Sequence, residues 1–129
     1  MRWFAVPPEG LLVEFEALVR VFFADSMSRE QLVETLNHIR ADMLAWQADG
    51  RAISESYLQG TAASLARAHV TSLIFPFFWG LTEFVLGWVA MVESEIADWP
   101  DLTPNEERSR RGLERFQLAP APAPNRLAR

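Results

Sequence analysis

The residues from Val70 to Trp99 constrain the fold of this chain more than any other part of the sequence. Their apolar side chains recur at helical spacing, on one stripe made of Val70, Ile74, Leu81, Val85, Trp88, Val92 and Trp99 and an adjoining one made of Phe77, Phe84 and Met91. Between Val70 and Val92 the only charged residue is Glu83. A helix that is apolar on nearly every side must be buried against its own chain, another subunit or lipid. The sequence therefore predicts a helical protein whose longest helix binds a partner.

The charge and the missing residue types limit the chemistry. The net charge is −5, with six Arg against thirteen acids in residues 1–99 and six Arg against four acids in residues 100–129. An acidic body repels phosphate, so we expect this chain alone to be a poor binder of nucleic acid. It has no cysteine and no lysine, which excludes disulfides, thiolate chemistry and Schiff-base lysines.

Two helices are predicted before the long one. Residues 1–10 read as an extended lead-in, because Pro7-Pro8 and Gly10 disfavour a helix. A first helix follows over residues 11–25. Its apolar face consists of Leu12, Phe15, Leu18, Val19 and Phe22.

Ser28 predicts the start of the second helix, because Gln31 stands three residues on and completes a capping box. The expected core positions of this helix recur at spacings of four and three residues: Leu32, Leu36, Ile39, Met43 and Trp46. We expect the helix to continue through Gly50, which costs about 1 kcal/mol relative to Ala. Residues 59–64 then connect it to the long helix.

The chain after the long helix predicts one short helix and a tail. Trp99-Pro100 closes the long helix, since a residue before proline avoids helical dihedrals. A short helix is expected from about Asn105 to Phe116, with Leu113 and Phe116 as its docking residues. Alternating Ala and Pro over residues 119–124 predict a disordered tail over residues 117–129.

No segment shows strand-like alternation, so the predicted class is all-α. We expect two long antiparallel helices and a shorter N-terminal helix, with residues 11–116 forming a dimeric helical bundle. Pro76 lies inside the long helix, and we expect its ring to clash with the Ser72 carbonyl and bend the axis.

The order of these signals points to a family. Trp3-Phe4 and Pro7-Pro8 precede residues 15–24, which read FEALVRVFFA. A capped helix follows, then Arg-Ala-His-Val at residues 67–70, then the aromatic helix that ends in Trp-Pro-Asp at residues 99–101. Over roughly residues 2–116 this order resembles the C-terminal half of PadR-family transcriptional regulators, in the branch related to virulence-gene activators.

The resemblance implies that DNA binding and dimerisation are carried out by different domains. In that family an N-terminal winged helix-turn-helix domain reads DNA, the C-terminal helices form the dimer, and some members bind small planar or phenolic effectors. The winged-helix half is not part of this sequence. The resemblance therefore implies that this chain reaches DNA only through a missing or separate winged-helix domain.

We expect a homodimer, because three helices cannot cover a long helix that is apolar on nearly every face. The predicted interface combines the first and third helices. Its residues are Phe15, Leu18, Phe22, Val70, Ile74, Phe77, Leu81, Val85, Trp88 and Val92.

The aromatic residues around Pro76 predict an effector pocket. The residues we assign to it are Phe75, Phe78, Trp79, Glu83 and Trp88. Aromatic faces suit a flat apolar ligand, and the Glu83 carboxylate can hold a cationic or hydroxylated edge. The alternative is that these rings fill the dimer core.

Residues 70–92 are also long enough to span a bilayer. Glu83, near their middle, costs roughly 2.5–3.5 kcal/mol on insertion scales, and the first two helices are amphipathic. Residues 1–8 lack the apolar core of a signal peptide. We therefore expect a buried dimer helix rather than a membrane span, and a cytoplasmic location.

Three further patterns have ordinary structural explanations. Glu30, Glu34, His38 and Asp42 recur at metal-ligand spacing but lie off the apolar stripe, so they predict a solvated face rather than a metal site. Glutamates interleave with the arginine cluster Arg108, Arg110, Arg111 and Arg115, and pairs such as Glu107 with Arg111 neutralise it. No G-x-S-x-G elbow and no glycine-rich phosphate loop occurs. We expect no enzyme, no metal and no cofactor.

The favoured interpretation is a dimerisation and effector-sensing domain of a PadR-like regulator without its own DNA-binding half. The alternative is a stand-alone small helical protein that binds a hydrophobic ligand or a partner protein.

Overall fold

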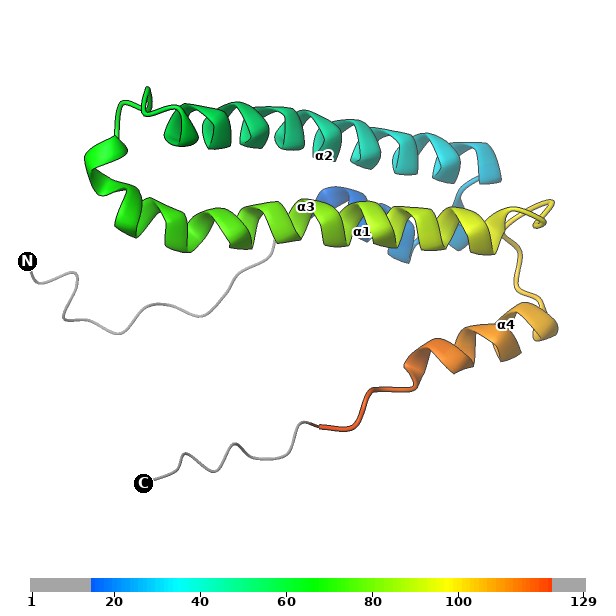
Figure 1. Cartoon of the computed structure of the whole chain (residues 1–129). Helices are drawn as coiled ribbons and strands as arrows, with labels where there is room; N and C mark the ends of the chain where they lie inside the picture. The colour runs from blue at the N-terminus through cyan, green and yellow to red at the C-terminus, as the bar shows by residue number, and fades with distance from the viewer. Residues whose placement is uncertain (1–14, 122–129) are drawn as a thin grey trace, which may run out of the picture.

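The structure, a computed structural model, describes residues 15–121, and every regular element in that range is a helix (Figure 1). The predicted all-α class is confirmed. The expected lead-in over residues 1–10, the start of the first helix at residue 11 and the end of the tail over residues 122–129 lie outside the described residues.

Two long helices dominate the fold. α2 (Arg29–Leu58) and α3 (Ala68–Ile96) lie side by side, and the short connection between them contains a 3₁₀ turn, η3 (Leu65–Arg67). α1 (Glu16–Phe22) and the 3₁₀ turn η2 (Ala24–Ser26) precede them. α4 (Glu106–Leu113) and η4 (Glu114–Phe116) follow.

The helix starts in the sequence are confirmed where a cap was predicted. Ser28 and Gln31 form the complete capping box at the start of α2. Gly50 interrupts neither the hydrogen bonding nor the course of α2, which runs on to Leu58. Asn105 caps α4 by accepting hydrogen bonds from the backbone N–H groups of Glu107 and Arg108.

Side-chain contacts show that α2 and α3 run in opposite directions. At the start of α2, Arg29 donates to the carbonyls of Ile96 and Ala97 at 3.4 Å. Further along, Arg40 pairs with Glu93. The guanidinium of Arg29 thus satisfies the C-terminal carbonyls of α3, where the helix dipole favours a positive charge.

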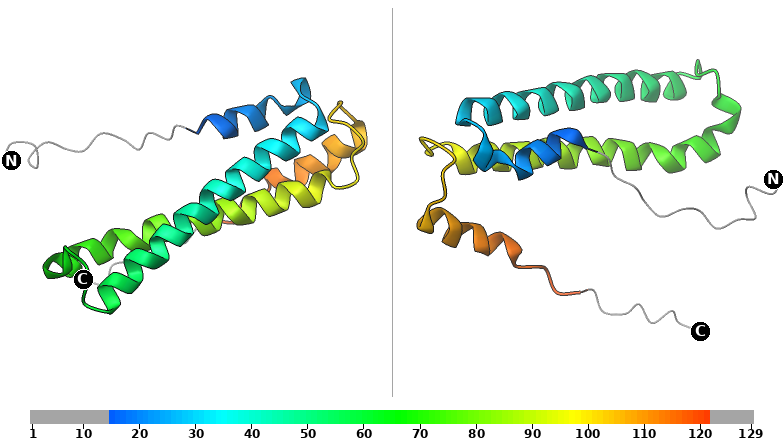
Figure 2. Two further views of the ribbon diagram at one scale, coloured as in Figure 1. Left: turned by 90° about the horizontal axis from the view of Figure 1, so that it is seen from above. Right: turned by 180° about the vertical axis from the view of Figure 1, so that it is seen from behind.

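The core lies at the end of the hairpin where α2 begins and α3 ends. Its buried apolar residues are Leu32, Leu36, Ile39, Met43, Val89, Ile96 and Leu102. From α1 and its turn, Phe15, Val21 and Met27 pack against this cluster. Seen from above, α2 and α3 cross at an angle (Figure 2, left). Crossing helices move apart away from their crossing, and no described apolar side chain is fully buried in the half of the hairpin beside the connection.

The register of the second helix differs from the prediction at one position. Leu32, Leu36, Ile39 and Met43 are buried as expected, but Trp46 is half exposed and Gln47 is buried instead. The stripe of a straight helix drifts around its axis relative to a 4-3-4-3 repeat. Residue 47 therefore faces α3, and Trp46 lies at the edge of the stripe.

The C-terminal predictions need two corrections. α3 ends at Ile96, three residues before Trp99, because Trp99 must leave the helical region ahead of Pro100 and Arg29 caps the earlier carbonyls. Leu113 and Phe116 are not docking residues, since both are largely exposed. Arginines, not these apolar side chains, attach α4 to α3.

The outward face of α3 is apolar and exposed. In this 29-residue helix only Thr82, Val89 and Ile96 are buried. The segment Leu65–Ile96 is long and apolar enough to cross a membrane. Only 11% of its apolar 18-residue window is buried inside the chain. α3 is continuous through Pro76, and its first turns are inclined to the rest of the helix (Figure 1), as expected when proline removes a hydrogen bond.

Candidate functional site

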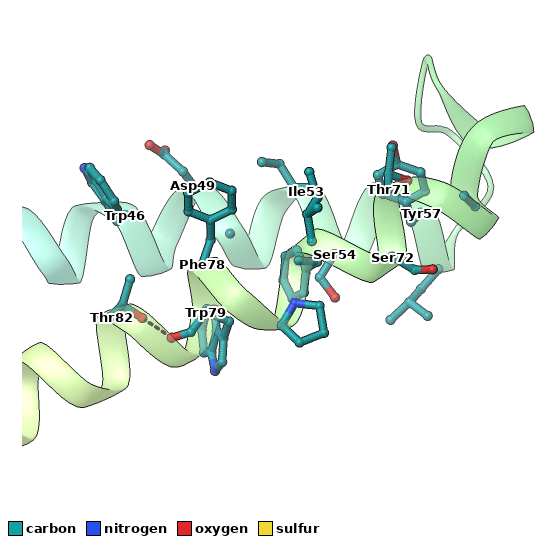
Figure 3. Close-up of a pocket in the computed structure, with 16 residues that line it drawn as sticks. Trp46, Asp49, Ile53, Ser54, Tyr57, Thr71, Ser72, Phe78, Trp79 and Thr82 are labelled. Atoms are coloured by element: carbon teal, nitrogen blue, oxygen red, sulfur yellow. Dashed lines mark hydrogen bonds between the residues drawn. The ribbon is translucent and has the colours of Figure 1, made fainter. Parts of the chain in front are cut away.

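A cavity of about 570 Å³ lies between the second half of α2 and the first half of α3 (Figure 3). Its walls are largely aromatic and aliphatic. From α2 they include Trp46, Asp49, Gly50, Ile53, Ser54, Tyr57 and Leu58, and from α3 Ala68, Thr71, Ser72, Ile74, Phe75, Pro76, Phe78, Trp79 and Thr82. The volume falls in the range of small-molecule sites.

Trp79 of α3 contacts residues of both helices. Its indole lies against Gly50, where an added Cβ would stand 3.2 Å from Cε3 and 3.3 Å from Cζ3 of the ring. Phe75 stacks on the indole at 6.2 Å between ring centroids, with 13° between the ring planes. The guanidinium of Arg51 lies 5.2 Å from the ring centroid, within the range of a cation–π contact.

A buried polar pair, Gln47 and Thr82, joins the two helices, and Thr82 lines the cavity. Gln47 Nε2 donates to Thr82 Oγ1 at 3.0 Å. The Thr82 hydroxyl donates to the Trp79 carbonyl at 2.7 Å (Figure 3). Both side chains are buried. An interhelical hydrogen bond between buried groups favours one register of α2 on α3, because any slip leaves a polar group unpaired.

The remaining polar groups lie along the walls. The Tyr57 hydroxyl forms a hydrogen bond with Ser64. This bond, with a second one to Thr71, lowers the pKa of Tyr57 from its usual value. Asp49 is the one carboxylate among the lining residues, and within residues 15–121 it forms no ion pair.

The polar groups of the walls are hydrogen-bonding groups that a ligand can use. The walls pair no nucleophile with a histidine, and they offer ring faces with hydroxyl groups and a single carboxylate at their polar positions. No three His, Cys, Asp or Glu side chains gather as metal ligands anywhere in the described part of the chain. A flat apolar ligand with a cationic or hydroxylated edge fits these walls best.

The structure brings together three of the five residues predicted for the effector pocket. Phe75, Phe78 and Trp79 line the cavity. Glu83 does not, because it lies about a quarter turn beyond Thr82 on the exposed side of α3. Trp88 does not either, because it packs against the core.

Sequence reasoning missed the α2 half of this cavity. The sequence predicts Trp46 as a core position, and no pattern in it indicates that α2 and α3 separate there. The available signal was Gly50 itself, since a glycine inside a long helix marks a close approach of another group.

The residues predicted for the dimer interface fall into two groups. The larger group is exposed on the chain and consists of Leu18, Phe22, Val70, Ile74, Phe77 and Leu81. The smaller group, Phe15, Val85, Trp88 and Val92, packs against the chain's own core while remaining partly accessible. The side chains of the larger group are not covered by other residues of the described chain.

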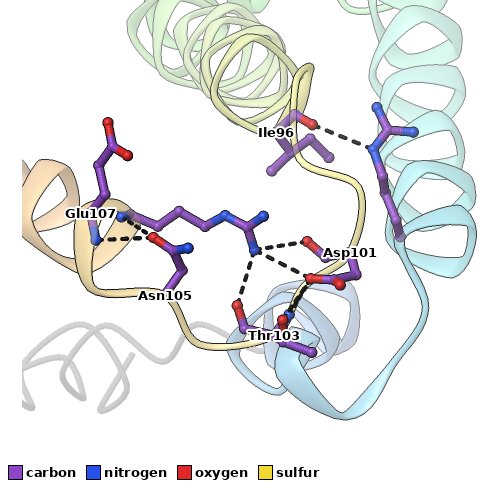
Figure 4. A network of polar contacts seen from close by, with 7 residues as sticks. Ile96, Asp101, Thr103, Asn105 and Glu107 are labelled. Atoms are coloured by element: carbon purple, nitrogen blue, oxygen red, sulfur yellow. Dashed lines mark hydrogen bonds and ion pairs between the residues drawn. The ribbon is translucent and has the colours of Figure 1, made fainter.

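The arginine cluster attaches α4 to the hairpin. Arg111 and Arg115 pair with Glu95 of α3 at 3.5 and 2.6 Å, whereas the expected pair of Arg111 with Glu107 does not form. Arg108 lies 4.8 Å from the Trp99 ring centroid and donates to Asp101 and Thr103 (Figure 4). Glu30, Glu34, His38 and Asp42, which the sequence predicts as a solvated face rather than a metal site, are all exposed on α2.

Comparisons with protein-family models, with curated proteins and with solved structures find no match for this chain.

Proposed function

We propose that this chain is a homodimerising helical domain with a ligand-sensing cavity, of the kind that the resemblance to the C-terminal half of PadR-like regulators implies. It holds two subunits together, and any DNA contact is made by a winged-helix domain outside this sequence. The observation that carries the proposal is the exposed apolar face of α3.

The energetics favour a protein partner for that face. Apolar surface exposed to water costs about 25 cal/mol per Å², and large contiguous apolar patches mark interaction sites. A bilayer also covers such a helix, but the carboxylate of Glu83 projects from its middle and costs several kcal/mol in lipid. A second subunit can leave Glu83 at the solvated edge of the interface.

The cavity supports a second candidate function, a stand-alone carrier or sensor of a hydrophobic ligand. Its aromatic walls lie within one chain, between α2 and α3, and need no second subunit to form. The two candidates differ in the oligomeric state that they require.

Light scattering at micromolar concentration tests the proposal. We expect twice the chain mass of 14.7 kDa, because the face of α3 is too apolar to remain hydrated. Leu81→Asp puts a charge on that face, so we expect it to yield monomer or aggregate, whereas the exposed α2 variant Leu58→Asp should remain dimeric. A compact wild-type monomer would contradict dimerisation and favour the stand-alone candidate.

The regulatory part of the proposal has a separate test. An in-frame winged-helix coding sequence directly upstream of the Met1 codon would support a regulator, whereas a promoter and ribosome-binding site there would favour the stand-alone protein.

A further inference from the structure

The exposed face of α3 carries a stripe of large residues interrupted by two glycines. Its members are spaced by four and three residues, and we call them the α3 stripe: Leu73, Phe77, Gly80, Phe84, Gly87 and Met91. Residues two positions before and after Thr82 lie about 160° from it around the helix. The stripe therefore lies opposite the buried residues Thr82 and Val89, and nothing in the described chain covers it.

The large members of the stripe are open to solvent. Leu73 is 75% exposed, Phe77 62%, Phe84 71% and Met91 43%. At Gly80 and Gly87 an added Cβ would meet no atom within 4 Å, so each glycine leaves a notch between neighbouring side chains. Intramolecular packing explains neither glycine.

The stripe is complementary to itself when it is reversed. Its six positions are symmetric about residue 82, so a second copy running antiparallel sets Leu73 opposite Met91, Phe77 opposite Gly87, and Phe84 opposite Gly80. Each phenylalanine then enters a glycine notch of the other helix, which is knob-into-hole packing. A parallel copy sets phenylalanine against phenylalanine and glycine against glycine, which overfills one level and leaves the next empty.

Charges at the ends of α3 favour the same orientation. The basic Arg67 directly precedes the helix, and the acidic Asp98 follows its end. Within residues 15–121 neither Arg67 nor Asp98 forms an ion pair. An antiparallel pair brings the basic start of one copy to the acidic end of the other at both ends of the interface, whereas a parallel pair sets like charges together.

The area is sufficient for a specific contact. Phe side chains bury 150–250 Å² each, so the four large side chains hide on the order of 500 Å² per copy and 1,000 Å² per pair, at the lower limit for specific interfaces. Ile74 and Leu81, both exposed beside the stripe, extend this area.

We propose that the occupant of the α3 stripe is a second copy of this chain. The two helices pack antiparallel about a twofold axis that passes between them at the level of residue 82. Phe84 and Phe77 then lie at Gly80 and Gly87 of the partner. This inference rests on the proposed dimerisation and specifies its geometry.

Disulfide trapping tests this geometry, because the chain has no cysteine of its own. Leu73→Cys and Met91→Cys are made separately and mixed under mild oxidation. We expect covalent dimer from the mixture and none from either variant alone, because a disulfide needs Cα atoms within about 7 Å, and residue 73 of one copy faces residue 91 of the other. Leu58→Cys on α2 replaces Leu73→Cys as the matched control and should not link to Met91→Cys.

Glycine variants give an independent measurement. Gly80→Leu fills a notch and should raise the dissociation constant of the dimer, measured by analytical ultracentrifugation, at least tenfold. Ala90 is exposed on the same helix but lies off the stripe, so Ala90→Leu should leave this constant unchanged. Leucine is a better helix former than glycine, so helix loss cannot explain a weaker Gly80→Leu dimer.

The outcomes separate the two proposals. Self-linking of Leu73→Cys would overturn the antiparallel register, and a wild-type dimer in which no pair links would overturn the stripe as the interface. A wild-type monomer in light scattering would overturn dimerisation itself. If the chain instead floats with phosphatidylcholine vesicles and the mixture does not link, lipid rather than a second copy covers the stripe.

Discussion

At the residue scale, the contact of Trp79 with Gly50 explains why a long helix tolerates a glycine in its interior. An alanine at position 50 would gain about 1 kcal/mol of helix propensity. The Trp79 ring, however, stands 3.2 Å from where its methyl group would lie, closer than ordinary carbon–carbon contact. Backbone propensity and side-chain packing therefore oppose each other at this position.

A double-mutant cycle tests this opposition. Gly50→Ala alone should change the free energy of unfolding little, because the displaced indole offsets the propensity gain. In a Trp79→Leu background the same change should stabilise the protein by about 1 kcal/mol, since the smaller side chain leaves room. Urea denaturation followed by circular dichroism measures both. Equal effects of Gly50→Ala in the two backgrounds would show that the ring does not restrict position 50.

At the scale of the element, α4 is attached by charge rather than by apolar contact. Arg111 and Arg115 reach Glu95, while Leu113 and Phe116 face solvent. The adjacent guanidinium of Arg115, followed by that of Arg111, holds the pKa of Glu95 below its ordinary value of 4.5. Because the pKa is lowered, these ion pairs contribute fully above pH 4.5 and are lost as the pH falls through the lowered value.

We therefore expect α4 to separate from α3 in acid while the hairpin stays folded. The amide signals of residues 106–113 in ¹H–¹⁵N NMR spectra should shift as the pH falls below 4.5. Glu95→Gln should show the detached positions already at pH 7, whereas Glu107→Gln, an exposed neutralisation on α4 itself, should resemble the wild type. If the α4 signals of Glu95→Gln match those of the wild type at pH 7, other contacts hold the helix.

At the scale of the whole molecule, the cavity between α2 and α3 predicts a fluorescence response to ligands. Trp79 lines the cavity and Trp88 packs against the core. Titration with flat aromatic cations and phenols should therefore quench tryptophan emission, and Trp79→Leu should weaken both the quenching and the binding. Trp88→Leu serves as the matched control and should leave the ligand-induced change in place. Trp46 lines the same cavity, so a response that survives Trp46→Leu and Trp79→Leu combined, or none at high micromolar ligand, would argue against a ligand site here.

A local signal in the sequence was enough for the start of α2. The capping box at Ser28 acts on neighbouring backbone groups, so it can be read without a fold. The apolar repeat from Leu32 to Met43 likewise predicted the buried face of α2. Errors began at Trp46 and Gln47, because the angle at which α2 crosses α3 decides which of two adjacent residues is buried.

The sequence by itself determined that this chain is helical and that α3 carries more apolar surface than one chain of this length can cover. Tertiary structure alone decided how that surface is divided. Packing of α3 on α2 buries Thr82 and Val89 and leaves Phe77 and Phe84 exposed on the opposite face. It also separates Trp79, in the cavity, from Trp88, at the core. A helix that is apolar all round has no periodicity that distinguishes its faces, so only the position of its neighbour can assign them.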